Sequence, residues 1–565
     1  MKNFIIRIAV VLLFLIAATW IINIAPKYEL TYKYKDSDLR VILDDVEITR
    51  DLRKLPEAAA ILGDEVLLSQ NTIDILFDKN LYYEEKYDTL ITTSENHRAN
   101  IKLDSRTMEI DGIEQGIKVP AQRQFYYYTR DDRYEEAESL PKNKEIIYIP
   151  IKELSEVYNI DIQFTDKLII TNKNSNISKV TVPENQKLEL KYLKDDTSKT
   201  IATIKPDDYV EIFNFAEFED FNIVRTSTGE LGYAKTSILK DFGLEVVSVA
   251  TENDNQSSGT IRLAWDYINP DNYSIGDKAS RSKITNLDIV APTLLFLQNT
   301  DGEVSFRINA VKEYMKWAND AGYKVWVTFK NDGKTLDEVS EFLHDMEHRN
   351  KAIKELIDFA KEYKVDGINV DFENMYKDDA ESFSQFIREL SIETKKANLI
   401  LSVCVNIPDG SDNWSLCYQH RLLSEAADYL AVMTYDCRAD LSSYASYDWV
   451  EENIEKLVVR DHVEPSKILL GIAFDSAYWK ITDSGNIRSV YYMNSAKKYL
   501  NGSEKWSEKA KQYYSGGEDQ KHLIWIEEKT SIKEKLNIID EYNLSGFACW
   551  CLGQETEDVW EVFKK

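Results

Sequence analysis

The chain has 565 residues, which is enough for several domains, one of which can be a complete α/β barrel. Its 97 acidic residues outnumber its 69 basic ones, and the formal net charge of −28 argues against a nucleic-acid partner. Composition therefore points to a multidomain globular protein and excludes a basic, nucleic-acid-binding one.

The N-terminus carries a membrane-anchor pattern. Lys2 and Arg7 precede an apolar run over residues 8–25. At about 1.5 Å per residue, a helix of this length spans a bilayer. No small-residue cleavage site follows, as a removed signal peptide would need. We therefore predict a signal anchor over residues 1–27 of a single-pass cell-membrane protein, with the rest of the chain outside. A secreted or wall-bound protein is the alternative.

Residues 28–177 are rich in Tyr, Ile and Thr, with turn residues between runs, and predict short strands. Two stretches, 65–93 and 146–171, echo one another. The pattern resembles the small α+β module at the N-terminus of copper amine oxidases. That resemblance implies a role in spacing or wall contact and no copper, because the region holds one histidine, His97.

Residues 178–242 change to short alternating strands and end in the sequence Gly-Glu-Leu-Gly-Tyr-Ala-Lys at 229–235. This ending resembles bacterial SH3-type domains, in which such a glycine-tyrosine turn closes the last hairpin. The resemblance implies binding of wall peptides. A purely structural barrel remains equally open, because a fold does not fix a function.

From residue 243 to 565, apolar strands alternate with amphipathic helices, which predicts a parallel (β/α)8 TIM barrel of the α/β class. An α+β insertion is predicted over about 479–529. The eight expected barrel strands are 261–265, 287–291, 324–329, 367–373, 400–405, 429–434, 468–473 and 546–552.

Cysteine and histidine usage indicates no metal site. The cysteines are odd in number and include no Cys-x-x-Cys pair, so we expect small buried hydrophobic residues and not a zinc ribbon. His344 and His348 match a short zinc-peptidase pattern, but no third ligand is evident, and we predict no metal and no cofactor. The cysteines are Cys404, Cys417, Cys437, Cys549 and Cys551.

The fourth expected strand, Asp366-Gly-Ile-Asn-Val-Asp-Phe-Glu373, carries the chemistry. Alternation places its apolar side chains on one face and Asn369, Asp371 and Glu373 on the other. Polar groups inside a parallel barrel cost several kcal/mol unless they are paired or used. Because active sites of such barrels lie at the C-terminal ends of the strands, Glu373 is the expected catalytic position.

These residues resemble the Asp-x-x-Asp-x-Asp-x-Glu signature of family 18 glycoside hydrolases, the chitinase-like enzymes. The Asn369 variant is similar to the spore-germination, cortex-lytic branch of N-acetylglucosaminidases. The resemblance implies that Glu373 is the general acid and that Asp371 binds the substrate's acetamido group, whose oxygen is the nucleophile. Asn369 is implied to contact substrate, but it cannot share a proton with Asp371, so we expect a shifted pH optimum.

Two more strands resemble the family. Residues 431–436, Ala-Val-Met-Thr-Tyr-Asp, resemble its Met-x-Tyr-Asp motif. Tyr435 is then the catalytic donor to the acetamido carbonyl, and Met433 and Asp436 line the substrate pocket. In the eighth strand, Trp550 is implied to form the floor under the cleaved sugar. The seventh strand departs from the branch, because Ala477 stands where relatives often carry Arg.

The resemblance implies a glycosidase that cleaves β-1,4 bonds at N-acetylglucosamine in peptidoglycan, including spore cortex, with retention of configuration. The alternatives are hydrolysis of chitin, which presents the same acetamido group, and a catalytically silent protein that only binds glycan in the cell wall. The expected partners are a glycan and, through the anchor, the cell membrane. Nothing in the sequence specifies an oligomeric state.

Overall fold

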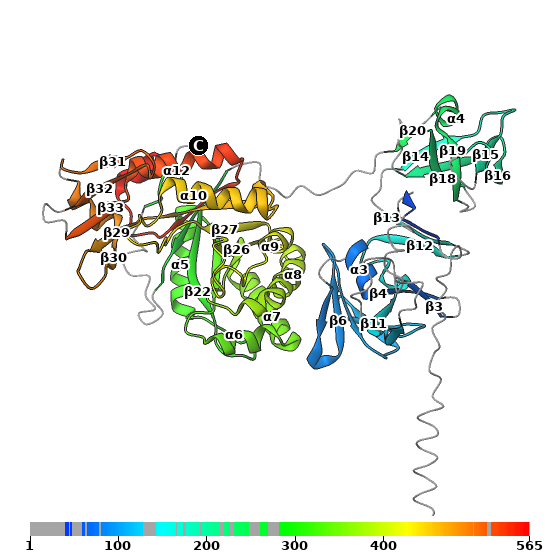
Figure 1. The fold of residues 1–565 in the computed structure, drawn as a ribbon. Helices are drawn as coiled ribbons and strands as arrows, with labels where there is room; N and C mark the ends of the chain where they lie inside the picture. Colours follow the sequence, from blue (N-terminus) through cyan, green and yellow to red (C-terminus); the bar gives the residue numbers. More distant parts are fainter. Residues whose placement is uncertain are drawn as a thin grey trace, which may run out of the picture. The chain divides into compact units, whose positions relative to one another are not determined.

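The computed structural model describes residues 40–43, 46–47, 59–62, 65–77, 81–127, 143–164, 167–172, 177–191, 195–213, 220–226, 231–243, 245–247, 260–268, 282–500, 502–516 and 521–563. The chain forms two compact units (Figure 1): Met1–Tyr83 with Tyr87–Asn253, and Glu84–Lys86 with Asp254–Lys565. The expected anchor over residues 8–25 lies outside the described residues. No helix within those ranges is long and apolar enough to cross a membrane.

The first part of the chain consists mainly of short strands, as the sequence predicts. Its sheets have the orders β12-β13-β1-β2, β10-β11-β4-β3 and β5-β6-β7-β8-β9. The elements are β1 (Arg40–Leu43), β2 (Val46–Glu47), β3 (Ala59–Leu62), β4 (Glu65–Ser69), α3 (Gln70–Leu76), β5 (Tyr82–Glu84), η1 (Glu85–Tyr87), β6 (Thr89–Thr93), β7 (Arg98–Lys102), β8 (Thr107–Ile110), β9 (Ile113–Gly116), β10 (Gln122–Tyr127), β11 (Asn143–Pro150), η4 (Lys152–Leu154), β12 (Ile160–Phe164) and β13 (Lys167–Asn172).

A seven-stranded sheet follows, with the order β16-β15-β19-β18-β17-β14-β20. It covers the region expected to be SH3-like, and that resemblance stays a prediction, as does the one to the amine-oxidase module. The elements are β14 (Ile177–Thr181), β15 (Leu188–Lys191), β16 (Thr200–Ile204), β17 (Tyr209–Phe213), β18 (Phe221–Thr226), β19 (Leu231–Lys235), α4 (Thr236–Asp241) and β20 (Glu245–Val247).

The second unit is a closed parallel barrel, which confirms the predicted fold class. Its strand order is β21-β34-β28-β27-β26-β25-β24-β22, and pairing of β21 with β22 closes the ring. The strands are β21 (Ile261–Asp266), β22 (Ile289–Leu297), β24 (Lys324–Lys330), β25 (Gly367–Asp371), β26 (Ile400–Asn406), β27 (Tyr429–Met433), β28 (Ile468–Ala473) and β34 (Gly546–Trp550). Each coincides with one of the eight expected strands, although their ends differ by a few residues.

Helices cover the outer face of the barrel. Apolar side chains of the strands and of these helices form one continuous outer core, and a smaller cluster fills the barrel interior. The main helices are α5 (Ile308–Ala321), α6 (Leu336–Leu343), α7 (Met346–Tyr363), α8 (Ala380–Lys396), α9 (His420–Ala426), α10 (Tyr447–Glu455) and α12 (Lys529–Tyr542). Shorter elements are β23 (Val304–Ser305), η6 (Lys377–Asp379), η7 (Lys456–Arg460), η8 (Pro465–Lys467) and η10 (Glu557–Glu561).

The alternation expected for β25 is confirmed. Ile368, Val370 and Phe372 are fully buried in the outer core, whereas Asn369 and Asp371 belong to the opposite, inward face. Gly367 begins the strand where a side chain has no room. An added Cβ would lie 2.7 Å from the Ile400 carbonyl oxygen and 2.8 Å from the Trp326 ring. Trp326 thus packs in the barrel interior beside the start of β25, whereas the polar residues Asn369 and Asp371 lie towards the C-terminal end of this strand.

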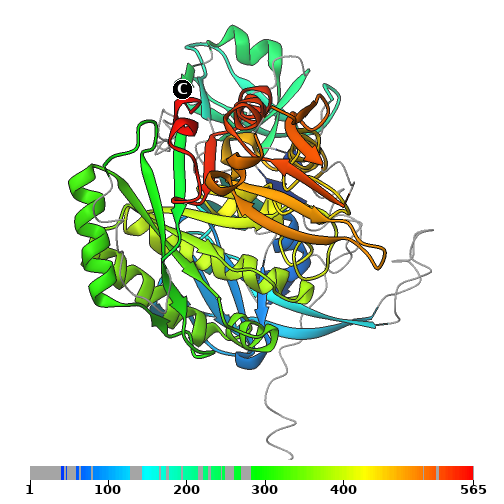
Figure 2. The same cartoon turned by 90° about the vertical axis from the view of Figure 1, so that its left-hand side faces the viewer.

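An insertion between β28 and α12 forms its own antiparallel sheet, with the order β30-β29-β33-β32-β31. It is drawn in orange in Figure 1 and again in Figure 2. The expected range of 479–529 begins too late, because β29 already starts four residues earlier, directly after β28. The elements are β29 (Asp475–Lys480), β30 (Ile487–Tyr492), α11 (Met493–Ala496), η9 (Lys497–Tyr499), β31 (Lys505–Ser507), β32 (Gln512–Gly516) and β33 (His522–Ile526).

Candidate active site

A cavity of about 560 Å³ opens at the C-terminal ends of the barrel strands. Asp371 and Glu373, from the end of β25, line it together with Tyr435 and Trp550. The structure thus brings together four residues that the sequence places on three separate strands. The remaining lining residues are Trp265, Lys330, Cys404, Asn406, Ile407, Asp409, Ser411, Trp414, Met433, Asp436, Cys437, Arg438, Ala439, Tyr444 and Trp449.

The environment of Glu373 suits a proton donor. Burial is the largest cause, and the charge of Asp371 the next, of a rise in the Glu373 pKa from 4.5 to about 8. The Lys330 ammonium opposes this rise, while Asp332 and Asp436 add to it. A carboxyl group with this pKa keeps its proton at neutral pH, as a general acid must before the reaction.

The backbone of Glu373 is held by Asn331, the residue that follows β24. Its side-chain amide donates to the Glu373 carbonyl oxygen at 2.8 Å, and its Oδ1 accepts from the Glu373 N–H at 3.0 Å. One residue earlier, the Phe372 carbonyl accepts a hydrogen bond from the Tyr418 hydroxyl at 2.7 Å. The segment beyond the last ladder bond of β25 is therefore fixed from two sides.

Asn369 does not line the cavity, contrary to the expectation that it contacts substrate. It is fully buried, and its Oδ1 accepts from Trp265 Nε1 at 2.9 Å. Its Nδ2 donates to Ser402 Oγ at 2.8 Å, and Thr328 and Cys404 also donate to Oδ1. Because both ends of the amide are bound within the barrel, Asn369 supports the strand from below the cavity.

Lys330, the last residue of β24, is a site residue that the sequence reasoning missed. The register of the two strands pairs it directly with Asp371, and its Nζ lies 3.2 Å from Asp371 Oδ2. Its side chain is only 7% exposed. The sequence signal that could have identified Lys330 was its spacing, because Trp326, Thr328 and Lys330 alternate along the strand and share its inward face. The expected strand, 324–329, ended one residue too early to include it.

The end of β27 supplies the other expected residues. Tyr435 lies parallel to Tyr444, with ring centroids 6.4 Å apart, and burial raises the pKa of its hydroxyl well above the usual value. It therefore stays a neutral donor. Met433 lines the same wall.

Asp436, the next residue, is paired with two arginines. Its Oδ2 accepts from Arg438 at 2.7 Å, and its Oδ1 accepts from Arg488 of β30 at 2.8 Å. Arg488 belongs to the strand beside Ala477, which directly faces Val490. Ala477 is the position at which relatives often carry Arg. The insertion thus supplies a guanidinium, that of Arg488, on the neighbouring strand.

Trp550, at the end of β34, lines the cavity, and its expected role as the floor under the cleaved sugar stays a prediction. Its ring lies 6.2 Å from that of Trp265 and 6.4 Å from that of Tyr267, measured between centroids. The Lys330 ammonium lies 5.8 Å from the Trp550 ring centroid. This part of the cavity wall is thus aromatic, with a cation close to it.

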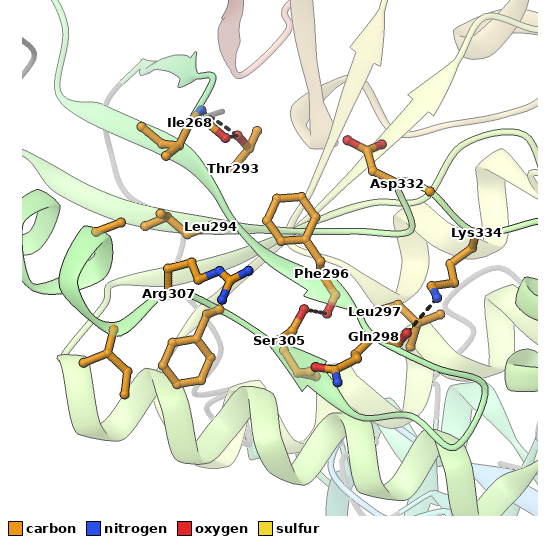
Figure 3. Close-up of a pocket in the computed structure, with 15 residues that line it drawn as sticks. Ile268, Thr293, Leu294, Phe296, Leu297, Gln298, Ser305, Arg307, Asp332 and Lys334 are labelled. Atoms are coloured by element: carbon orange, nitrogen blue, oxygen red, sulfur yellow. Dashed lines mark hydrogen bonds between the residues drawn. The ribbon is translucent and has the colours of Figure 1, made fainter. Parts of the chain in front are cut away.

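A second cavity of about 770 Å³ lies beside the first, at the ends of β22 and β24. Figure 3 shows Phe296 in the middle of its wall, between Arg307 on one side and Asp332 and Lys334 on the other. Asp332 lines this second cavity and lies 3.3 Å from Lys330, which lines the first. An ion pair therefore lies between the two cavities.

The remaining sequence signals lie away from the cavity or add packing. His344 contacts Asp379 at 3.1 Å, whereas His348 contacts Asp345 at 3.4 Å, so the two histidines face different carboxylates. Among the described residues no group of His, Cys, Asp and Glu side chains could hold a metal ion. All five cysteines are free and buried, as expected.

The sequence was compared with known proteins. The family model described as Glycosyl hydrolases family 18 matches residues 263–555. Among curated proteins, the chain is 26% identical over 323 residues to the uncharacterized glycosylase YvbX of Bacillus subtilis, a match that covers 52% of this chain and 90% of that protein. It is 23% identical over 254 residues to the cortical fragment-lytic enzyme of Bacillus anthracis, covering 42% of this chain and 58% of that protein.

The match to the Bacillus anthracis protein spans little more than half of that protein's length. Among solved structures, a chitinase from Chromobacterium violaceum aligns with a TM-score of 0.47 at 23% identity, covering 54% of this chain and 98% of that one.

Proposed function

The chain belongs to family 18 of the glycosyl hydrolases and is a glycosidase, and from this premise we propose that it cleaves peptidoglycan at β-1,4 bonds next to N-acetylglucosamine. The observation that carries the proposal is the pair at the end of β25. A partly buried Glu373 with a pKa of about 8 stands two residues from Asp371, which is ion-paired with Lys330.

Each step of the proposed reaction is assigned to the substrate or to a residue that lines the cavity. Glu373 gives its proton to the glycosidic oxygen as the bond breaks. The substrate's own acetamido oxygen attacks the anomeric carbon. Asp371 accepts a hydrogen bond from the acetamido N–H and stabilises the cyclic oxazolinium that forms. Tyr435 donates to the acetamido carbonyl. The ionised Glu373 then takes a proton from the water that opens the ring, and the configuration is retained.

Peptidoglycan is proposed over chitin because a relative with detectable identity is named a cortical fragment-lytic enzyme. The N-terminal modules and the expected anchor would also hold the barrel near the cell's own wall. Spore cortex is the form of peptidoglycan that this relationship favours.

The test is to digest purified cortex, vegetative wall and chitin oligomers in parallel and to identify the new reducing ends by mass spectrometry. N-acetylglucosamine at the new reducing ends of wall material supports the proposal, and cleavage of chitin oligomers alone replaces peptidoglycan by chitin. Glu373→Gln keeps the shape of the side chain and removes its proton, so hydrolysis should fall by roughly 10²-fold or more while glycan binding persists. Equal binding without hydrolysis by the unaltered protein would instead show a silent glycan-binding protein.

A further inference from the structure

Lys330 is an unusual residue for the interior of a parallel barrel. It ends β24 on the inward face, its side chain is 7% exposed, and it lines the catalytic cavity. Burying an ammonium group is unfavourable unless it is paired, and a hydrophobic residue of similar volume at such a place is often at least as stable. Packing alone therefore does not account for a lysine here.

The geometry places the ammonium between two carboxylates. Lys330 Nζ lies 3.2 Å from Asp371 Oδ2 and 3.3 Å from Asp332 Oδ2. Among the described residues, Lys330 is the one cation that is ion-paired with Asp371. Asp332, which is half exposed, approaches the ammonium from the side of the second cavity. Lys330 thus forms ion pairs with Asp332, on the side of the second cavity, and with Asp371, on the side of the catalytic cavity.

The two oxygens of Asp371 have different surroundings. Oδ2 is taken by Lys330, whereas Oδ1 is buried and has no hydrogen-bond partner within the described part of the chain. A buried carboxylate oxygen without a hydrogen-bond donor is unfavourable, and one that borders a cavity can accept a hydrogen bond from a ligand there. In the reaction proposed above, the acetamido N–H is that donor.

Asn369 cannot set the orientation of Asp371 by sharing a proton, and its amide is fully engaged with the barrel wall. We propose that Lys330 is a positioning residue that binds one oxygen of Asp371 and thereby presents the other to the acetamido N–H of the substrate. This inference rests on the proposed glycosidase reaction.

Lys330 also acts electrostatically on the acid. Charged groups facing Glu373 are Asp371, Asp332 and Asp436, which favour its protonated form. Lys330 and the more exposed Arg438 oppose them. Cys404 and Tyr435 lie near the same pair and stay neutral, because burial raises the pKa of each well above its usual value. Removing the ammonium therefore raises the pKa of Glu373 further above about 8.

The experiment compares Lys330→Met, Lys330→Arg and Lys334→Met with the full-length unaltered protein, on an aryl glycoside of N,N′-diacetylchitobiose between pH 5 and pH 10. Lys334 serves as the matched control, because its ammonium bonds to the Gln298 carbonyl at 2.6 Å and not to Asp371. Lys330→Met should lower kcat/KM at pH 6 by about 10- to 100-fold, since misplacing a reacting group costs this much. Its alkaline limb should move to higher pH, Lys330→Arg should restore part of the activity, and Lys334→Met should match the unaltered protein.

The outcomes separate the inference from the function on which it rests. If Lys330→Met keeps the unaltered kcat/KM and alkaline limb, the inference is wrong while the glycosidase assignment stands. If Lys330→Met loses activity and its melting temperature together, with an unmoved alkaline limb and no rescue by Lys330→Arg, the lysine is merely structural and the inference is again wrong. If the unaltered protein is no more active than Glu373→Gln, the proposed function itself fails.

Discussion

The raised pKa of Glu373 makes a prediction about stability that is independent of any substrate. The folded protein holds the Glu373 proton up to about pH 8, whereas the unfolded chain releases it near the ordinary value of 4.5. Between these values the folded state binds more protons than the unfolded state, so stability falls as the pH rises. The slope is about 1.4 kcal/mol per pH unit, which amounts to about 4 kcal/mol between pH 5 and pH 8.

Glu373→Gln removes this contribution, because an amide does not titrate. The variant should therefore gain stability relative to the unaltered protein as the pH rises from 5 to 8. At roughly 1–3 °C per kcal/mol for a unit of this size, the difference in melting temperature should widen by several degrees. Other titrating groups are common to both proteins, so their pH dependence cancels in the difference.

The assay is calorimetry of the barrel's unfolding transition at pH 5 and pH 8 for both proteins. Glu381→Gln, on an exposed position in the first turn of α8, is the matched control and should show the same melting-temperature difference at both pH values. A Glu373→Gln difference that does not change between pH 5 and pH 8 would refute the argument that burial holds the proton on this carboxyl. It would also remove the reason to expect kcat/KM to fall above about pH 8.

Three further predictions test the site and the anchor. Trp550→Ala removes the aromatic floor and should weaken substrate binding by about tenfold, measured by calorimetry with the Glu373→Gln background. Removing the N-acetyl group on the non-reducing side of the scissile bond should abolish cleavage, because the proposed nucleophile is then missing. A thiazoline mimic of the intermediate should inhibit, because Asp371 and Tyr435 are proposed to bind the cyclised shape, and equal cleavage of both substrates would contradict this. If residues 8–25 form an anchor, fractionation should recover the full-length chain in membranes, and a shortened soluble form would disprove it.

The barrel was predictable because each of its strands has a local sequence pattern. Buried parallel strands read as short apolar runs, and all eight runs became barrel strands in the structure. The inward position of Asp371 and Glu373 followed from the two-residue period of a strand, which needs no tertiary information. The start of the insertion was misplaced because β29 follows β28 with one residue between them, so that the apolar run does not end where the barrel does.

Other parts of the site depend on contacts that one sequence does not display. Asn331 fixes the backbone of Glu373 across 42 residues of chain, and Arg488 reaches Asp436 from an insertion strand 52 residues away. Neither side chain belongs to a recognisable motif. An amide or a guanidinium in a loop or an edge strand is usually solvated, so the residue type alone does not predict such a contact. Such positioning contacts depend on strand register and loop path, which the packed structure determines.

The amide at position 369, where the family signature has Asp, and the ammonium of Lys330 are electrostatically linked through Asp371. A carboxylate at position 369 would lie beside Asp371 in the barrel interior, and two close carboxylates there can be accommodated only if they share a proton. With a neutral amide at 369, fixed by the Trp265 and Ser402 hydrogen bonds, no shared proton is available to Asp371. The Lys330 ammonium, one strand away and in direct register, balances the charge instead. Because the neighbouring carboxylates raise the pKa of Lys330, its ammonium keeps its proton, and Glu373 makes both proton transfers of the proposed reaction.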